Sequence, residues 1–151
     1  MHPATKYRVP DRVCHAIDAA KDKCKIVYVK AEYSPENSVR PRSVERHPEY
    51  YPCRRDHWGA DLIKPLADLA QLGATITKPH FDAFFQTVLL RSLKKWKVED
   101  IFLAGVETDV CILRTAQTPA LRGYKTTILK DCVASSDVRL ARAARRRGAP
   151  G

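Results

Sequence analysis

The sequence has no apolar stretch that approaches the roughly 20 residues a membrane-spanning helix needs. Its first ten residues, MHPATKYRVP, also lack the apolar segment of a secretory signal peptide. From these two absences we expect neither a membrane-spanning helix nor a leader of the usual kind. We therefore expect a cytoplasmic protein with no membrane partner.

Paired cysteine motifs are also absent. The chain has five cysteines, an odd number, and no two of them form a CxxC pair. A disulfide framework and a zinc knuckle both require such regular pairing, so the sequence favours neither. The cysteines are Cys14, Cys24, Cys53, Cys111 and Cys132.

Acidic residues are scarce, since 17 Asp and Glu stand against 27 Lys and Arg, which gives a net charge of +10. Such a charge suggests acidic partners, nucleic acid included. Much of the excess, however, lies in the run KKWK and in the Arg-rich tail 139–151, and charge runs are usually solvated. The sequence shows no RNA-binding aromatic signature, zinc finger or helix-turn-helix. Nucleic-acid binding through the tail is therefore a third hypothesis that the sequence does not favour.

Apolar periodicity divides the chain into alternating helices and short strands. The 151 residues suffice for one domain with a single core. The segment 59–73 is partly helical and interrupted by Pro65, Pro119 kinks the last helix, and Gly123 ends it. The long segment Glu32–Gly59, which carries four prolines, reads as a functional or mobile loop. The pattern predicts helices over 11–23, 81–96 and 108–124, and strands over 25–31, 74–78, 100–105 and 125–131.

This order predicts an α/β fold with a parallel sheet covered by helices on both faces. In such sheets, ligands bind where the strands end. Lys78 ends one predicted strand, and the stretch Gly105–Cys111 follows another, so both fall on the same rim. A thiol at a helix N-terminus with a lysine nearby is favoured as the thiolate, and free N–H groups of the first turn can hold an oxyanion. On spacing alone, a core Cys111 and a surface Lys78 would be the better reading.

Three stretches favour a functional pair of Cys111 and Lys78 over that structural reading. They are TKPHFDAFFQTVL, VEDIFLAGVETDVCILRTA and LRGYKTTILKDCVASSD. They resemble the isochorismatase-like cysteine hydrolases, a family that includes isochorismatases, nicotinamidases, N-carbamoylsarcosine amidases and ureidoacrylate amidases. The resemblance runs from the first helix to Asp137 and is strongest between Lys78 and Ser136. The lysine, the aromatic segment and the GVxTDxC turn occur in the family's order.

The resemblance implies a three-layer α/β/α fold with a mostly parallel, Rossmann-like sheet and an Asp-Lys-Cys triad. Cys111 matches the family's nucleophile and Lys78 matches its lysine. The family's cis peptide falls on Val106–Glu107, and its oxyanion hole falls on the backbone N–H groups of Glu107 and Cys111. Thr108 and Asp109 would organise the turn and cap the helix.

By the same resemblance, the thiolate attacks an amide-like carbonyl of a small substrate, a thioester forms, and water hydrolyses it. Amide and carbamoyl compounds are the expected substrates. Isochorismatase members instead cleave a vinyl ether, and the motif does not separate these reactions. Family members commonly form oligomers, so we expect a homo-oligomer.

The sequence departs from the family at its beginning. The family's aspartate ends a first strand that lies in the middle of the sheet, but residues 1–10 contain neither an apolar strand nor an Asp. Asp11 is the nearest carboxylate and reads as a helix start. Without the strand, its neighbours would lack a hydrogen-bonding partner. We expect the domain 1–138 to be incomplete and followed by the tail 139–151, both ends shortened as in a gene model with misplaced ends, and the chain to be inactive.

We expect no metal and no other cofactor. Nicotinamidase-type members hold a metal through an Asp-x-His motif, and the matching stretch VKAEYSPENS has no histidine, while His47 and His57 come later in the loop. A non-catalytic binding or assembly protein of the same fold is the alternative function. The substrate pocket is predicted from aromatic residues that core packing would explain equally well, namely Tyr33, Trp58, Phe81 and Phe84.

Overall fold

The computed structural model describes residues 8–34, 53–120, 122–136 and 139. Its strands are β1 (Ile26–Ala31), β2 (Gly73–Lys78), β3 (Asp100–Val106) and β4 (Lys125–Ala134). β1 pairs with β2 and β3 pairs with β4, both in parallel. The predicted α/β fold with parallel strands is therefore confirmed. The strands nevertheless form two separate two-stranded sheets within the described residues.

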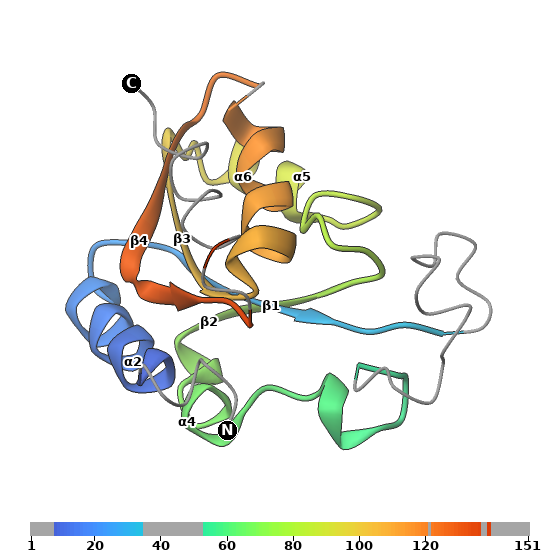
Figure 1. Ribbon diagram of the computed structural model, residues 1–151. Coiled ribbons are helices and arrows are strands. Elements are labelled where there is room, and N and C mark those ends of the chain that lie inside the picture. The colour runs from blue at the N-terminus through green and yellow to red at the C-terminus, as the bar shows by residue number, and fades with distance from the viewer. Residues whose placement is uncertain (1–7, 35–52, 121, 137–138, 140–151) are drawn as a thin grey trace.

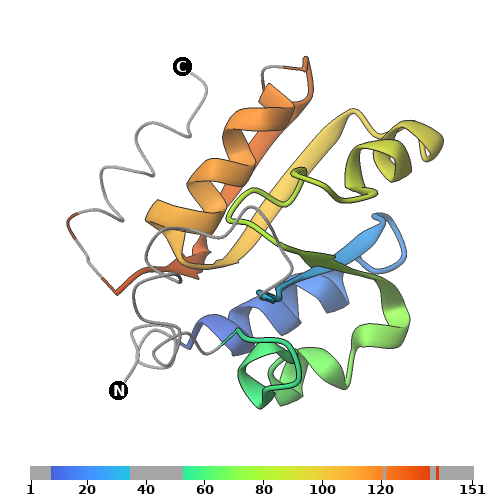
Figure 2. The same cartoon turned by 90° about the vertical axis from the view of Figure 1, so that its right-hand side faces the viewer.

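Helices lie on both sides of these strands (Figures 1 and 2). The helices α2 and α4 lie on one side, and α5 and α6 lie on the other. Short turns of helix, η2, η3 and η4, join these elements. The bounds are α2 Val9–Ala20, η2 Trp58–Ala60, α4 Lys64–Ala67, η3 Ala70–Leu72, α5 Leu89–Lys95, η4 Thr108–Ile112 and α6 Leu113–Ala120.

Helix α2 begins two residues earlier than the sequence predicts because Pro10 occupies its first turn, where a proline needs no N–H partner. Its buried residues are Val9 and Ile17. The helix packs against β3 and β4 of one strand pair. It also packs against α4, which precedes β2 of the other pair. The Arg12 guanidinium donates to the Asp131 carbonyl at 3.2 Å, which ties α2 to β4.

The helix predicted over 81–96 forms only from Leu89 to Lys95. The Asp82 carboxylate accepts a hydrogen bond from the Phe84 N–H at 2.9 Å, and Gln86 has φ of 52°, so residues 81–87 form turns instead. Side-chain hydrogen bonds of Asp commonly compete with helical backbone bonds in this way. The predicted apolar stripe is divided accordingly, because Leu89 and Leu93 are buried while Phe85 and Val88 are exposed.

Prolines set two other helix boundaries, which the sequence analysis placed wrongly. Pro65 lies in the first turn of α4 and starts that helix instead of interrupting a longer one. Pro119 lies next to the last residue of α6, and its carbonyl accepts from the N–H groups of Arg122 and Tyr124. The helix therefore ends at Ala120, before Gly123, which turns the chain with φ of 83°.

The core lies between α5 and the strands. Its buried cluster joins Ile76 of β2 to Leu89 and Leu93 of α5, with Ile101 of β3 packed against it. Gly73 starts β2 where a Cβ would lie 2.2 Å from the Ile26 carbonyl oxygen, so the close parallel pairing there requires glycine. Both strand pairs thus contribute to one core although no strand pairing joins them.

Parts of the predicted organisation lie outside the described residues. The boundary at residue 138 and the tail 139–151 do so except for Arg139, and so does most of the long loop, at 35–52. Among the residues that are described, no helix is both long and apolar enough to cross a membrane.

We expect Leu93→Ala to lower the free energy of unfolding by about 2–4 kcal/mol, because it leaves a cavity in the buried cluster. Val88→Ala is the matched control, since the Val88 side chain is exposed and its loss should cost less than about 0.5 kcal/mol. Urea unfolding followed by circular dichroism measures both values. Equal losses would contradict the placement of α5.

Candidate active site

The Cys111 thiol lies at the centre of the site, in the helical turn η4 that follows β3. Gly105, near the end of β3, has φ of 121°, a backbone conformation that favours glycine. The next peptide, Val106–Glu107, is cis, and η4 starts at Thr108 directly after it. The Glu107 carbonyl accepts from the N–H groups of Val110 and Ile112, which fixes the turn around Cys111.

Lys78, the last residue of β2, reaches this thiol. Its ammonium lies 3.1 Å from Cys111 Sγ and donates to the Phe81 carbonyl at 2.7 Å. The lysine is only 5% exposed. The ammonium places a positive charge directly against the sulfur, inside the fold. The reading that made Lys78 a surface charge is therefore wrong.

The turn that follows β2 is held in place by α6. The Thr115 hydroxyl accepts from the Ala83 N–H at 3.1 Å, and the Thr118 hydroxyl donates to the Asp82 carboxylate at 2.7 Å. These bonds position the Phe81 carbonyl, which in turn holds the Lys78 ammonium. The sequence analysis did not single out these threonines, although both follow Cys111 at helical spacing.

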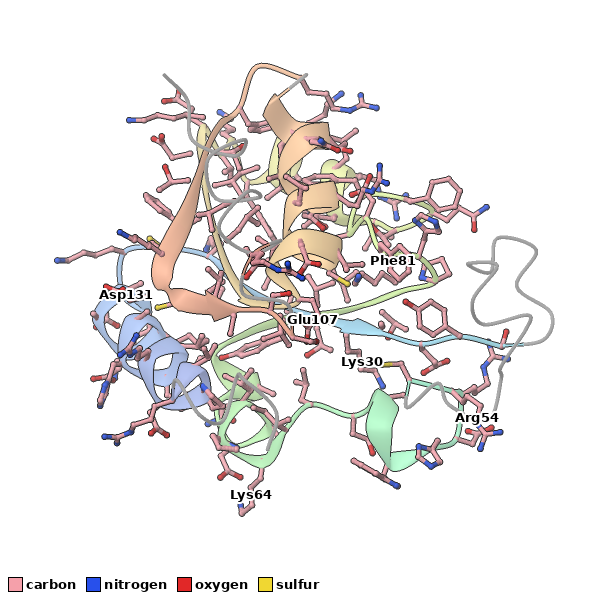
Figure 3. The ribbon with its side chains drawn as sticks, in the orientation of Figure 1. Lys30, Arg54, Lys64, Phe81, Glu107 and Asp131 are labelled. Atoms are coloured by element: carbon pink, nitrogen blue, oxygen red, sulfur yellow. The ribbon has the colours of Figure 1, made fainter. Side chains whose placement is uncertain are left out.

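Hydrogen bonds also tie the end of β4 to η4. The Glu107 carboxylate accepts from both the backbone N–H and the hydroxyl of Ser136, at 2.6 and 2.9 Å. The Ser135 hydroxyl donates to the Asp109 carboxylate. The Glu107 side chain, which the sequence analysis left without a role, therefore has a structural one. Figure 3 shows Glu107 close to the start of α6.

The predicted helix cap by Thr108 and Asp109 is not formed. Glu107 occupies the cap position and makes no side-chain capping bond. Asp109 faces Ser135 instead, and the fully buried Thr108 hydroxyl has no hydrogen-bond partner among the described residues. A buried hydroxyl without a partner costs free energy, so Thr108 stabilises the turn less than a hydrogen-bonded hydroxyl would.

No carboxylate accompanies the pair of Lys78 and Cys111 in the described part of the chain. Asp11, the nearest carboxylate in sequence to the family's aspartate, forms an exposed ion pair with Arg8 at 2.8 Å. It therefore belongs to the first turn of α2 and has no part in the site.

The four aromatic residues of the predicted pocket have different surroundings in the structure. Tyr33 is buried, and Phe84 packs against the core cluster. Trp58 is 78% exposed and lines a separate hollow of about 320 Å³ with Lys30, Glu32 and Asp61. Phe81 is the one whose backbone contacts Lys78, and Figure 3 places it near the start of α6.

The residues after β1 do not fit a metal site. Glu32, which lies near the position of the family's metal motif, pairs with Arg55 at 3.2 Å and Lys30 at 3.7 Å, while Glu36 lies outside the described residues. No group of three or more potential ligand residues occurs within the described ranges. His47 lies outside those ranges, so the expectation of no metal stays a prediction.

The remaining cysteines differ from Cys111 in their surroundings. Burial raises the pKa of the Cys53 thiol, and the neighbouring Cys111 raises it further, with Lys78 opposing this effect. Burial likewise raises the pKa values of Cys14 and Cys132. Cys53 is thus a neighbour of the site that the sequence analysis passed over, and no sequence spacing signals it.

We expect limiting iodoacetamide at neutral pH to alkylate Cys111 before Cys14, Cys53 and Cys132. A raised pKa keeps those three thiols protonated to higher pH, so their alkylation should increase only above the usual thiol range near 9.0. Lys78→Ala should remove the preference for Cys111, while the exposed Cys24 serves as the internal standard. Peptide mass mapping across pH measures this, and uniform labelling of all five cysteines would contradict it.

Comparisons with known proteins agree with this architecture. A family model described as "Isochorismatase domain" matches residues 1–150. The chain is 38% identical over 61 residues to the uncharacterized isochorismatase family protein YaaI of Bacillus subtilis, which covers 40% of this chain and 34% of that protein. It is 26% identical over 93 residues to the nicotinamidase of Saccharomyces cerevisiae, over 52% of this chain and 43% of the enzyme. The chain thus spans less than half the length of these curated relatives.

Solved structures show the same fold. The pyrazinamidase/nicotinamidase of Streptococcus mutans superposes with a TM-score of 0.77 at 24% identity, over 90% of this chain and 77% of that one. The N-carbamoylsarcosine amidase of Thermoplasma acidophilum gives 0.75 at 19% identity, over 93% and 78%. Because the family model covers almost the whole sequence, the chain belongs to the isochorismatase family of hydrolases.

Proposed function

We propose that this chain carries the nucleophilic half of a cysteine hydrolase site that acts on a small amide or carbamoyl compound. The observation that carries the proposal is the 3.1 Å contact between the buried Lys78 ammonium and the Cys111 thiol. The nicotinamidase of S. cerevisiae and the N-carbamoylsarcosine amidase of T. acidophilum, as their names state, act on such compounds. Their similarity supports this substrate class.

The reaction would proceed through the sulfur of Cys111. The thiolate attacks the carbonyl carbon, and backbone N–H groups of Glu107 and Cys111 stabilise the oxyanion of the tetrahedral intermediate. The amine leaves with a proton, a thioester remains, and water hydrolyses it. Lys78 holds the thiolate during the attack. The proton that the leaving amine takes up must come from an acid. Among the described residues, no carboxyl group next to Lys78 is available to supply it.

For that reason we propose that the isolated chain acylates its cysteine but turns over amides slowly. General acid–base catalysis contributes about 10²–10⁴-fold in typical enzymes, so its loss should lower amide turnover by about that factor. The fold would be the family's three-layer α/β/α arrangement with the strand between its two sheets left out. Assembly into a homo-oligomer also stays a proposal.

A second function is favoured by a different observation. In the part of the chain that the structure describes, the buried lysine has no carboxylate and the two strand pairs are not joined, which fits a non-catalytic member that binds or assembles with another molecule. Such a protein would keep the contact between Lys78 and Cys111 for structural reasons. Acylation chemistry separates the two functions, because a binding protein has no need of a reactive thiol.

We expect p-nitrophenyl acetate to acetylate Cys111 in a single turnover, because an activated ester needs no protonated leaving group. Intact-mass and peptide mass spectrometry measure the adduct. Cys111→Ser should abolish it, and Cys24→Ser should leave it unchanged, since Cys24 is exposed and lies outside the site. Acetylation of Cys111 no faster than that of Cys24 would favour the binding protein.

Amide turnover is the companion measurement. Ammonia release from nicotinamide by residues 1–151 should fall about 10²–10⁴-fold below that of the S. mutans enzyme assayed beside it. A rate equal to that enzyme's would show that the isolated chain already contains its proton donor. The assignment of Cys111 as nucleophile would survive that result, and the proposed slow turnover would not.

A further inference from the structure

The segment 81–87 forms turns where the apolar spacing predicts the first half of a helix. In a helix, the Phe81 carbonyl would accept a hydrogen bond from the Phe85 N–H, four residues later. Here the Phe85 N–H bonds to the Asp82 carbonyl instead, at 3.3 Å. In the described part of the chain, no backbone N–H bonds to the Phe81 carbonyl. This carbonyl is therefore available to accept the Lys78 ammonium, at 2.7 Å.

Side chains bond the backbone groups that the predicted helix would use. The Asp82 carboxylate accepts from the Phe84 N–H at 2.9 Å. The Thr115 hydroxyl accepts from the Ala83 N–H at 3.1 Å, and the Ala83 carbonyl accepts from the Thr87 hydroxyl at 2.6 Å. Asp and Thr side chains compete with helical hydrogen bonds in this way. Three side chains thus keep the segment out of the helix.

The turns are not the conformation that this segment favours by itself. Residues 83–88 include no glycine or proline that would break a helix. Gln86 has φ of 52°, and a left-handed conformation costs a residue other than glycine about 1–2 kcal/mol. The turns persist because contacts with the rest of the fold offset this cost. Ala83 is buried in the core cluster, and Phe84 packs against it.

Asp82 makes the polar contact that joins these turns to α6. One of its carboxylate oxygens holds the turn, and the other accepts from the Thr118 hydroxyl at 2.7 Å. Thr118 lies three residues after Thr115, so both threonines lie on one face of the helix. Among the described residues, no hydrogen bond or ion pair joins Asp82 to Lys78 or Cys111. Any effect of Asp82 on the thiol must therefore pass through the turn.

We propose that Asp82 is a positioning residue for the chemistry of Cys111. By keeping its segment out of a helix, it leaves the Phe81 carbonyl available to hold Lys78 against the thiol, which lies 3.1 Å from the ammonium. A lysine side chain has a flexible four-carbon stem, so an acceptor in a fixed position determines where its ammonium lies. The inference deepens the proposed function and rests on it, because the quantity it predicts is the reactivity of Cys111.

We expect Asp82→Ala to lower the single-turnover rate constant for acetylation of Cys111 by p-nitrophenyl acetate about tenfold to a hundredfold. The reason is that the ammonium loses its fixed acceptor, and small displacements of reacting groups have effects of this size. The same variant should increase the helical signal in far-UV circular dichroism, because alanine favours the helix and no longer holds the Phe84 N–H. Peptide mass spectrometry measures the rate constant.

Asp82→Asn is the conservative variant. Its side-chain oxygen can still accept from the Phe84 N–H, and its NH₂ group can donate to the Thr118 hydroxyl. We therefore expect it to keep the rate constant and the helical signal of the unchanged protein. Thr118→Val should lower the rate constant, and Thr118→Ser should restore it. Asp68→Ala is the matched control, because it removes an exposed carboxylate bonded to Lys64 and should change neither quantity.

A double-mutant cycle tests whether Asp82 acts through Lys78. In a Lys78→Ala background, Asp82→Ala should lower the rate constant no further, because the ammonium that it positions is gone. An equal further loss would overturn the inference. An unchanged rate constant in Asp82→Ala would do the same, and so would a lower one without a gain of helix. Thr118→Val goes through the same cycle, so the test stands even if Asp82→Ala does not fold.

Failure of the proposed function has a separate signature. In that case Cys111 of the unchanged protein is acetylated no faster than the exposed Cys24. A Cys111 thiol that is reactive but insensitive to both Asp82→Ala and Thr118→Val overturns only the positioning role.

Discussion

The contact between the Lys78 ammonium and the Cys111 thiol is the constraint around which the described structure is arranged. It joins the end of β2 to the turn after β3, and so it joins the two strand pairs at the site, whereas no pairing between the described strands does so. Keeping a lysine buried there requires the Phe81 carbonyl, which the α6 threonines hold in position. The end of β4 is tied to the same place through Ser135 and Ser136.

The site is therefore more complete than the sheet that supports it. The Lys78 ammonium reaches the Cys111 thiol of η4, and the cis peptide stands between β3 and η4. What the described residues lack is a negative charge beside the ammonium and a strand beside each open edge.

Much of this could be read from the sequence. The alternation of short apolar strands and helices gave the α/β class, and the GVxTDxC turn with a lysine at the end of an earlier strand singled out Cys111 and Lys78. These signals are local and depend on few contacts.

The errors occurred where a side chain competes with the backbone or where contacts are distant in sequence. Asp82 and the positive φ of Gln86 turned the first half of a predicted helix into turns, although the apolar spacing was helical. Trp58 lines a hollow with Lys30, Glu32 and Asp61, which are distant from it or unmarked by any motif in the sequence. Thr115, Thr118, Ser136 and Cys53 reach the site through folding alone, and no motif marks them.

Open edges have a consequence for the behaviour of the protein in solution. Within the described ranges β3 pairs on one side alone and carries an exposed Phe102, and such an edge can pair with the same strand of another molecule, which is the usual route to edge-to-edge aggregation. Here each molecule carries a net charge of +10, and like charges keep such edges apart at low ionic strength. Added salt screens that repulsion, with a Debye length that falls from about 30 Å at 0.01 M to about 3 Å at 1 M. Colloidal stability should then depend on ionic strength more than the free energy of unfolding does.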